Sequence, residues 1–244
     1  MTNDWQDNQQ YHAVHPQAWD YIRQQGFLGL IIDRKYGGKH FSTLAHSDII
    51  TKLGSRSPSL AVSVMVPNSL GPAELLMTYG TQQQKDYYLP RLAGGEEIPC
   101  FALTSPEAGS DAASIPDVGV VCEQEFEGQP TVGIRLTLDK RYITLAPIAT
   151  LIGAAFHLQD PDGLLGQTVD VGITVALIPA NLPGVETGPR HLPLHQHFMN
   201  GVIRAQDVFI PLDWILGGRS MAGKGWQVLM ESLSIGRSIS LPAL

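Results

Sequence analysis

The chain has 244 residues, of which 43% are hydrophobic and 16% are charged, and its formal net charge is -7. This composition is typical of a globular protein with one large domain or two modest ones, and the acidic balance disfavours a nucleic-acid-binding surface. Cys100 and Cys122 form neither a disulfide framework nor a metal-binding spacing. Since the sequence has no basic N-terminal region and no run of 18 apolar residues, we expect no signal peptide, no membrane span and a cytoplasmic location.

Residues 1–97 show the features of helices. Apolar residues recur at helical spacing over residues 43–53. Thr81 and Gln84 have the spacing of a capping box, which predicts a helix that starts there and ends near Pro90. We therefore predict an N-terminal helical domain over residues 1–97.

The apolar period changes from 3.6 to 2 at about Ile98. Residues 131–138 and 171–178 alternate between apolar and small or polar side chains, which is typical of half-buried strands. Residues 127–130 and 160–163 supply turns. Strands of this kind, with long connections, predict an antiparallel β-barrel or sandwich domain over residues 98–217.

The helical pattern returns after the β-region. Trp226, Leu229, Met230 and Leu233 follow the spacing i, i+3, i+4, i+7. A single amphipathic helix without a partner predicts that residues 218–244 are the truncated start of a C-terminal helical domain. The predicted class is therefore α+β, with a helical domain, a β-domain and the first helix of another helical domain.

The stretch from Phe101 to Asp111 reads as a strand that ends in a polar loop. Pro106 has no backbone N–H, so a strand ladder ends there. Gly109 has no Cβ, so the backbone amides around it can approach an anionic ligand closely. These residues by themselves allow two interpretations: an ordinary strand-to-loop exit, or a ligand-binding loop.

Five blocks in this stretch and elsewhere resemble motifs of the acyl-CoA dehydrogenase family. They are Tyr36-Gly37-Gly38, Thr104-Ser105-Pro106-Glu107-Ala108-Gly109-Ser110-Asp111, Lys140-Arg141-Tyr142-Ile143-Thr144, the segment from Gly184-Val185-Glu186 to Leu216-Gly217, and Gly223-Lys224-Gly225-Trp226 with Gly236-Arg237. Residues 99–111 are most similar to the large bacterial enzymes of fatty-acid β-oxidation. The resemblance favours the ligand-binding interpretation of this loop.

The resemblance implies FAD as the cofactor. Transferred residue by residue, the backbone of Leu103 and the hydroxyl of Thr104 would hydrogen-bond the pyrimidine edge of the flavin. Ser110 would face the FAD pyrophosphate and the CoA side, and Thr144 would lie near flavin N5. Tyr142 would stand beside the isoalloxazine, where the family usually has Trp, so its smaller ring would contact less of the flavin.

The resemblance also implies a reaction, the α,β-dehydrogenation of fatty acyl-CoA to trans-2-enoyl-CoA in β-oxidation. Ser110, Ser234 and Arg237 correspond to substrate-binding positions. We expect no catalytic base on this chain, because the family's usual base lies beyond residue 244 and Gly236 stands where a subgroup carries it. Glu231 lies on the same predicted helix but points elsewhere. We therefore expect the isolated chain to be inactive and to bind FAD weakly.

The family's usual partners are an electron-transferring flavoprotein as electron acceptor and further copies of the subunit, so the resemblance implies a homo-oligomer at full length. Two alternatives stay open. The chain could be a non-catalytic binding or assembly fragment of the same fold, or it could belong to the acyl-CoA oxidase branch, which reoxidises its flavin with O₂. The preferred acyl chain length is also open.

Two further patterns are weak. Residues 218–224 fit the spacing of a phosphate-binding loop, but Gly225 stands where that loop needs Ser or Thr for Mg²⁺. His191, His195 and His197 are clustered without a nearby Cys or carboxylate, so a metal site is disfavoured. We expect a helix entry at the first and a solvated loop edge at the second.

Overall fold

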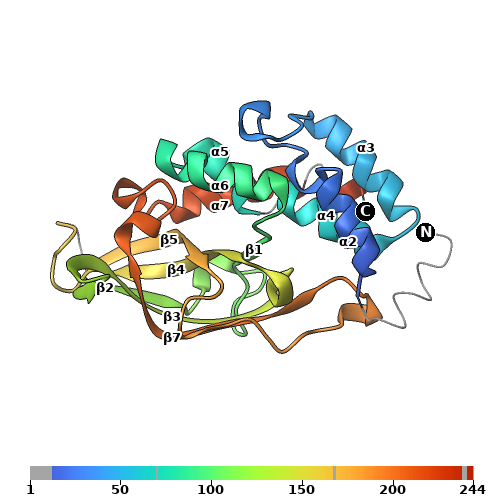
Figure 1. Cartoon of the computed structure of the whole chain (residues 1–244). Coiled ribbons are helices and arrows are strands. Elements are labelled where there is room, and N and C mark those ends of the chain that lie inside the picture. The colour runs from blue at the N-terminus through green and yellow to red at the C-terminus, as the bar shows by residue number, and fades with distance from the viewer. Residues whose placement is uncertain (1–12, 70, 167–168, 238–240, 244) are drawn as a thin grey trace.

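A computed structural model describes residues 13–69, 71–166, 169–237 and 241–243 (Figure 1). The described helices are α2 (Pro16–Gln24), α3 (Thr43–Gly54), α4 (Pro58–Met65), α5 (Pro72–Tyr79), α6 (Gln82–Gly94) and α7 (Gly225–Ile235). The described strands are β1 (Pro99–Ala102), β2 (Val118–Phe126), β3 (Gln129–Thr144), β4 (Leu151–Gln159), β5 (Asp170–Pro179), β6 (Val185–Glu186) and β7 (Asn200–Pro211).

The α+β class is confirmed: helices precede and follow one curled sheet. Figure 1 shows the helices gathered along one side of the sheet, with α7 lying beside α5 although it is far from it in sequence. Helix α7 packs against β5, and α5 packs against β1 and α7. The predicted domain boundaries, at 97/98 and 217/218, fall in connections between these elements.

The sheet is mixed, which differs from the antiparallel sheet that we predicted. Its strand order is β1-β4-β2-β3-β7-β6, with β5 also paired to β4. The pairs β1–β4 and β2–β4 are parallel, whereas β2–β3, β3–β7, β4–β5 and β6–β7 are antiparallel. Alternation along a strand does not encode the direction of its neighbour, so this feature was not visible in the sequence.

Strands β1 and β2 share one edge of β4. Residues 99–102 pair with residues 151–154, and residues 118–120 pair with residues 157–159. The chain thus leaves this edge after Ala102 and returns to it at Val118. The polar loop singled out in the sequence is the segment that connects the two.

Helix α6 starts where its capping box predicts but does not end near Pro90. The side chains of Thr81 and Gln84 both make the reciprocal capping hydrogen bonds, and the helix continues to Gly94 with Pro90 inside it. Proline removes one helical hydrogen bond. Burial of Leu92 and Ala93 beyond it favours continuing the helix, so the predicted end near Pro90 is wrong.

The hydrophobic core lies between the helices and the sheet in two clusters. Strand β4 is buried from Leu151 to Phe156, because it has partners on both edges and helices over one face. The apolar stretch Pro58–Tyr79 is long enough to span a membrane by length and composition, but 88% of its most apolar window is buried inside the protein. This is the behaviour of core helices, and it is weak evidence for a membrane span.

Candidate functional site

The loop of residues 103–117 crosses the gap between β1 and β2 and is tied down within itself. The backbone groups of Ser105 and Ala108 hydrogen-bond each other at 3.0 and 3.3 Å, and Ser114 Oγ donates to Asp111 Oδ2 at 2.6 Å. The Nε2 atom of His157 on β4 lies 3.2 Å from the carbonyl oxygen of Ala113. The loop is therefore a fixed part of the fold.

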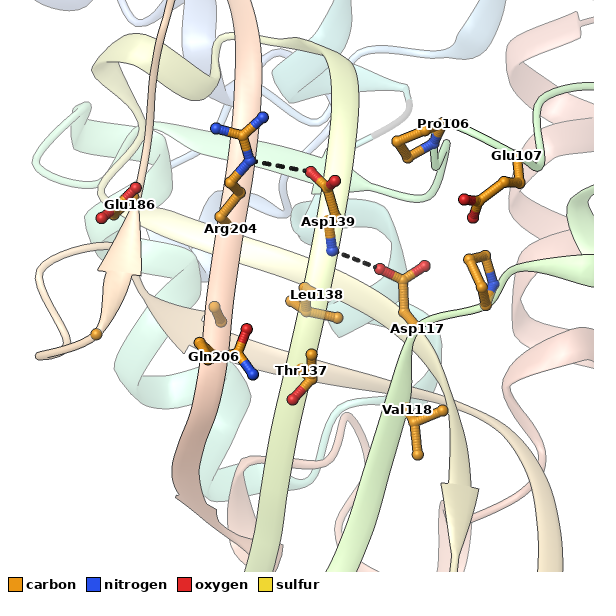
Figure 2. A pocket seen from close by; sticks show the side chains of 13 residues that line it. Pro106, Glu107, Asp117, Val118, Thr137, Leu138, Asp139, Glu186, Arg204 and Gln206 are labelled. Carbon is orange, nitrogen blue, oxygen red and sulfur yellow. Dashed lines mark hydrogen bonds and ion pairs between the residues drawn. The ribbon is translucent and has the colours of Figure 1, made fainter.

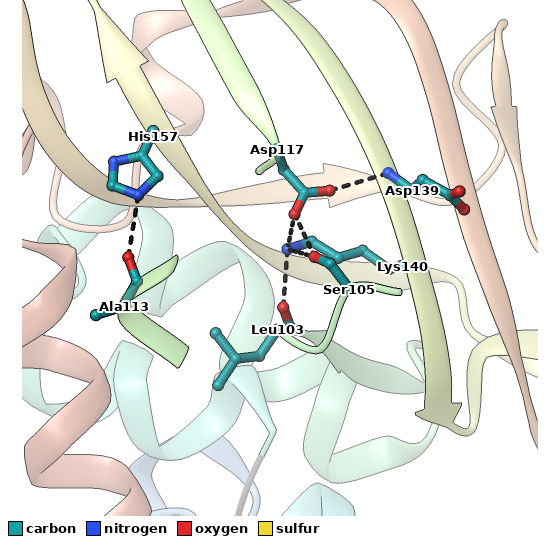
Figure 3. Close-up of polar contacts among 7 residues, drawn as sticks. All are labelled: Leu103, Ser105, Ala113, Asp117, Asp139, Lys140 and His157. Carbon is teal, nitrogen blue, oxygen red and sulfur yellow. Dashed lines mark hydrogen bonds and ion pairs between the residues drawn. The ribbon is translucent and has the colours of Figure 1, made fainter. Parts of the chain in front are cut away.

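A buried lysine joins the two ends of this loop (Figure 3). Lys140 Nζ donates to the Leu103 carbonyl at 2.8 Å, to Ser105 Oγ at 3.2 Å and to Asp117 Oδ2 at 2.6 Å. The Ser105 hydroxyl also donates to Asp117, and the Asp139 N–H donates to Asp117 Oδ1 at 2.9 Å. All three protons of the ammonium therefore have acceptors.

The ion pair is almost completely removed from water, since the side chains of Lys140 and Asp117 are 0% and 1% exposed. Burial lowers the pKa of Lys140, and the attraction of Asp117 opposes that lowering. A buried pair of this kind contributes to stability only if its geometry is good and its remaining protons and lone pairs are satisfied. The hydrogen bonds described above meet this condition.

The motif from Lys140 to Thr144 does not by itself assign a role to Lys140. A signal was nevertheless present: Ile134, Leu136, Leu138 and Lys140 alternate along one strand, and so face the same side. All four are buried. A lysine at an inward position of a strand needs a buried partner, but the strand pattern does not reveal that Asp117 supplies it.

Four of the predicted cofactor residues line one cavity of about 200 Å³: Leu103, Thr104, Tyr142 and Thr144. Its remaining lining is apolar and comes from Val66, Leu75, Phe101, Ile143, Leu229 and Leu233. The cavity therefore lies where the end of β1 and the end of β3 meet helices α5 and α7. An apolar pocket with a few convergent hydroxyls is the usual form of a small-ligand or cofactor site.

Tyr142 reaches this cavity through an irregularity in β3. The register of β3 with β7 shifts between Lys140 and Ile143, and Tyr142 has φ 56°, a left-handed conformation that is uncommon for an aromatic residue. Tyr142 is consequently 54% exposed, as Arg141 before it is also exposed, whereas Lys140 and Ile143 are buried. Such strain persists only where surrounding structure holds it, and it is concentrated at functional sites.

The other predicted site residues do not line the cavity. Ser110 is exposed in the loop, and Ser234 and Arg237 are exposed near the end of α7. A Cβ built at Gly109, beside Ser110, would meet no protein atom within 4 Å among the described residues, so protein packing does not require glycine there. The roles assigned to Ser110, Ser234 and Arg237 stay predictions.

A partly buried carboxyl, Glu74, lies on α5 next to the cavity-lining Leu75. Its Oε2 atom is buried and has no hydrogen-bond partner among the described residues. Burial raises the pKa of Glu74 from its ordinary value of 4.5 to about 7. The unfolded chain therefore releases this proton near pH 4.5, whereas the folded chain holds it until about pH 7. Stability should consequently fall as the pH rises through this window.

We expect the substitution Glu74→Gln to remove this pH dependence. At pH 8 the free energy of unfolding of the variant should exceed that of the wild type by about 1–2 kcal/mol, a value reduced because Glu74 is partly exposed to solvent. At pH 4.5 the two proteins should be of similar stability. Urea unfolding of both proteins across this pH range measures the difference. Glu123→Gln on the exposed side of β2 is the matched control. A wild-type stability that rises from pH 5 to 8 relative to the Glu74→Gln variant would contradict the assignment.

A second cavity, of about 450 Å³, is lined in part by Pro106, Glu107 and Asp117 of the loop (Figure 2). Charges of both signs border it: Figure 2 shows Arg204 paired with Asp139, with Glu107 and Glu186 around them. The Arg204 Nε to Asp139 Oδ1 distance is 3.1 Å, and both side chains are more than half exposed. Among the described residues that line this groove, Arg204 is the one cationic side chain, and it is already paired, so no ligand class follows from the lining.

The first weak pattern is a loop that enters a helix, as expected, whereas the solvated edge expected at the second holds only for His195, because His191 and His197 are half-buried. Residues Gly218 to Lys224 form a loop with a short 3-10 helix that leads into α7. The glycines serve close packing on β5, because a Cβ at Gly223, which has φ 77°, would lie 2.2 Å from the Val171 carbonyl oxygen. Among the described residues, no group of three or more His, Cys, Asp or Glu side chains could hold a metal ion.

Comparison with known proteins shows which family this chain resembles. Residues 1–96 match the family model described as acyl-CoA dehydrogenase, N-terminal domain. The probable acyl-CoA dehydrogenase FadE10 of Mycobacterium tuberculosis is 28% identical over 224 residues, 91% of this chain and 32% of that protein. An acyl-CoA dehydrogenase structure from Geobacillus kaustophilus has a TM-score of 0.80 at 25% identity, over 98% of this chain and 60% of that chain. The N-terminal portion of the chain matches the acyl-CoA dehydrogenase family, and the rest of the described chain shares that family's fold.

Two more comparisons delimit what this membership covers. Protein HemX of Proteus mirabilis is 55% identical over 89 residues, 36% of this chain and 52% of that protein. An acyl-CoA dehydrogenase from Bacillus anthracis complexed with FAD shares the fold, with a TM-score of 0.73 at 24% identity over 89% of this chain and 34% of that chain. The chain thus spans between 32% and 52% of the length of these curated relatives, and its match to the family model lies in the N-terminal domain.

Proposed function

We propose that this chain supplies the flavin-contacting wall of an FAD-dependent acyl-CoA dehydrogenase, which converts fatty acyl-CoA to trans-2-enoyl-CoA. One observation carries the proposal: Leu103, Thr104, Tyr142 and Thr144, which come from two separate strand ends, line the same cavity. The match to the acyl-CoA dehydrogenase family supports the general class of reaction. The fatty acyl-CoA substrate and the place of the reaction in β-oxidation are part of the proposal.

The lining residues fit an isoalloxazine ring. Tyr142 offers a half-exposed aromatic face, and the side chains of Thr104 and Thr144 offer hydroxyls at the polar edge of an otherwise apolar space. The Leu103 carbonyl accepts from Lys140, so its N–H is the backbone group that we expect to face the cofactor. When bound, the flavin supplies the capacity to accept a hydride.

The residues of this chain orient the cofactor and exclude water in this proposal, and they do not abstract the α-proton. No Asp, Glu or His lines the cavity within the described part of the chain. Glu231 on α7 is exposed and accepts a hydrogen bond from Gln227 at 3.1 Å, so it is not directed into the cavity lining. We therefore propose that the catalytic base is contributed from outside the residues described.

Partners follow from the same proposal. We infer an electron-transferring flavoprotein as the acceptor and a homo-oligomeric assembly, both from family resemblance. The competing proposal, a non-catalytic binding or assembly fragment of this fold, differs in one respect: it requires no ordered flavin at the cavity. FAD binding therefore separates the two.

The test is a titration of the purified chain with FAD, followed by absorbance, before and after a long-chain acyl-CoA is added. We expect weak FAD binding that the substitution Tyr142→Ala weakens by about tenfold, because a stacked aromatic contact contributes about 1 kcal/mol or more. The matched control is Tyr87→Ala, since Tyr87 is 52% exposed and lies on α6 away from the cavity.

Acyl-CoA should leave the flavin spectrum oxidised, because no base lines the cavity among the described residues. Bleaching of the flavin by acyl-CoA would contradict the proposed absence of a base, while leaving the flavin site standing. Absence of FAD binding, or equal losses in Tyr142→Ala and Tyr87→Ala, would contradict the flavin site itself.

A further inference from the structure

The segment of residues 190–200 leads into β7 and contacts two of the predicted flavin residues, Tyr142 and Thr144. Asn200, the first residue of β7, is 3% exposed and pairs with Thr144 in the β3–β7 register. Its side-chain Nδ2 lies 3.3 Å from Thr144 Oγ1, and its Oδ1 lies 3.3 Å from His191 Nδ1. The backbone N–H of His191 also donates to the Asn200 carbonyl at 2.8 Å.

These contacts determine what the Thr144 hydroxyl can do. A threonine hydroxyl carries one hydrogen to donate and lone pairs to accept. Because Asn200 Nδ2 donates to Thr144 Oγ1, one lone pair is occupied and the hydroxyl hydrogen stays available. Thr144 lines the cavity, so this hydrogen can be given to an acceptor atom of a ligand there.

The same segment also holds the aromatic residue of the site. The rings of His191 and Tyr142 have their centroids 4.8 Å apart at an angle of 51°. His191 therefore contacts the Tyr142 ring at a tilt and Asn200 through its Nδ1 atom. Tyr142 is half exposed and sits at a strand irregularity, and the guanidinium carbon of Arg141 lies 5.2 Å from its ring centroid.

The segment is itself anchored, which a positioning role requires. Arg190 Nη2 donates to the His197 carbonyl at 3.0 Å, and the backbone of Arg190 bridges to Gly201. The His197 N–H donates to Ser59 Oγ on α4 at 3.2 Å. The segment thus connects the edge of the sheet to the helical layer.

We propose that Asn200 and His191 are positioning residues for the flavin site. Asn200 holds the Thr144 hydroxyl as a donor toward the cavity, and His191 holds the Tyr142 ring while it orients the Asn200 amide. The hydroxyl and the ring, which would contact different parts of the ligand, are thereby oriented by one unit. This inference rests on the proposed function, since the ligand is the isoalloxazine of FAD.

The test compares FAD affinity, by titration, for variants of this unit. Asn200→Asp keeps the size of the side chain but removes the donor, so the Thr144 hydroxyl should turn to the carboxylate and FAD should bind about tenfold more weakly. Thr144→Val should cost a similar factor. The double variant should lose no more than either single variant, because both remove the same interaction. His191→Leu should weaken binding about threefold, and its matched control His195→Leu, on the exposed part of the segment, should not.

Circular dichroism first checks that each variant folds. If Asn200→Asp does not fold, the test rests on His191→Leu. Wild-type affinity in His191→Leu and in any folded Asn200→Asp, together with a loss in Tyr142→Ala, would overturn the positioning unit and leave the proposed function standing. Multiplicative losses in Asn200→Asp and Thr144→Val would also overturn it. A wild-type chain that binds no FAD would overturn both proposals.

Discussion

Replacing Lys140 by Met should lower the free energy of unfolding by about 3–5 kcal/mol. The ammonium of Lys140 has three acceptors, Leu103, Ser105 and Asp117, and the side chain is fully buried. Removing it leaves the Asp117 carboxylate buried without a counter-charge, and a buried charge without a partner strongly destabilises the folded state. Urea unfolding followed by circular dichroism measures the change.

The control is Lys52→Met on the exposed surface of α3, which should change the stability by less than about 0.5 kcal/mol. The double variant Lys140→Met/Asp117→Leu should recover part of the loss, because it removes the uncompensated charge as well. Equal stability of Lys140→Met and wild type would show that the pair does not hold the loop. A double variant less stable than Lys140→Met would show that the lost charge is not the cause.

Replacing Gln84 by Leu should lower the free energy of unfolding by about 3 kcal/mol. Gln84 is 7% exposed and joins the start of α6 to the chain that leaves the sheet. Its Nε2 donates to the carbonyls of Asp213 and Ile215 at 3.0 and 2.8 Å, and its Oε1 accepts from the N–H of Gly217 at 2.9 Å. Leucine leaves these backbone groups without partners, at a cost of about 1–3 kcal/mol for each buried group.

Two variants make this prediction specific. Gln83→Leu, one residue away and exposed, should change the stability little. Gln84→Glu keeps the acceptor for Thr81 and Gly217 but has no hydrogen to donate to Asp213 and Ile215, so we expect a loss as well. If Gln84→Glu matched the wild type at pH 7, the two donated hydrogen bonds would not contribute.

Much of the fold could be predicted because the relevant patterns are local. The alternation of residues 131–138 and 171–178 predicted β3 and β5, and the pair Thr81 and Gln84 predicted the start of α6. Each of these signals needs only neighbours a few residues away in the chain. The end predicted near Pro90 was wrong for the opposite reason, since the helix beyond it continues through contacts with distant residues.

The site divides in the same way. Resemblance assigned Leu103, Thr104, Tyr142 and Thr144 to one cofactor, and the structure places all four around one cavity. Asp117, His191 and Asn200 received no site role from the sequence, although they contact Lys140, Tyr142 and Thr144 directly. Each of these three residues is brought to the site by the pairing of strands that are distant in sequence, which local sequence patterns do not specify.

The sequence by itself determined the succession of helices, strands and helix, and the polar loop after Phe101, because periodicity, caps and breaks in a strand are properties of short segments. The tertiary structure decided that β1 and β2 share one edge of β4, so that this loop crosses the gap between them. It also decided that Lys140, from β3, hydrogen-bonds Leu103 and Asp117 at the two ends of this loop. The physical reason is that a buried charge or an unpaired strand edge specifies only that a partner is needed, and packing between distant segments selects the partner.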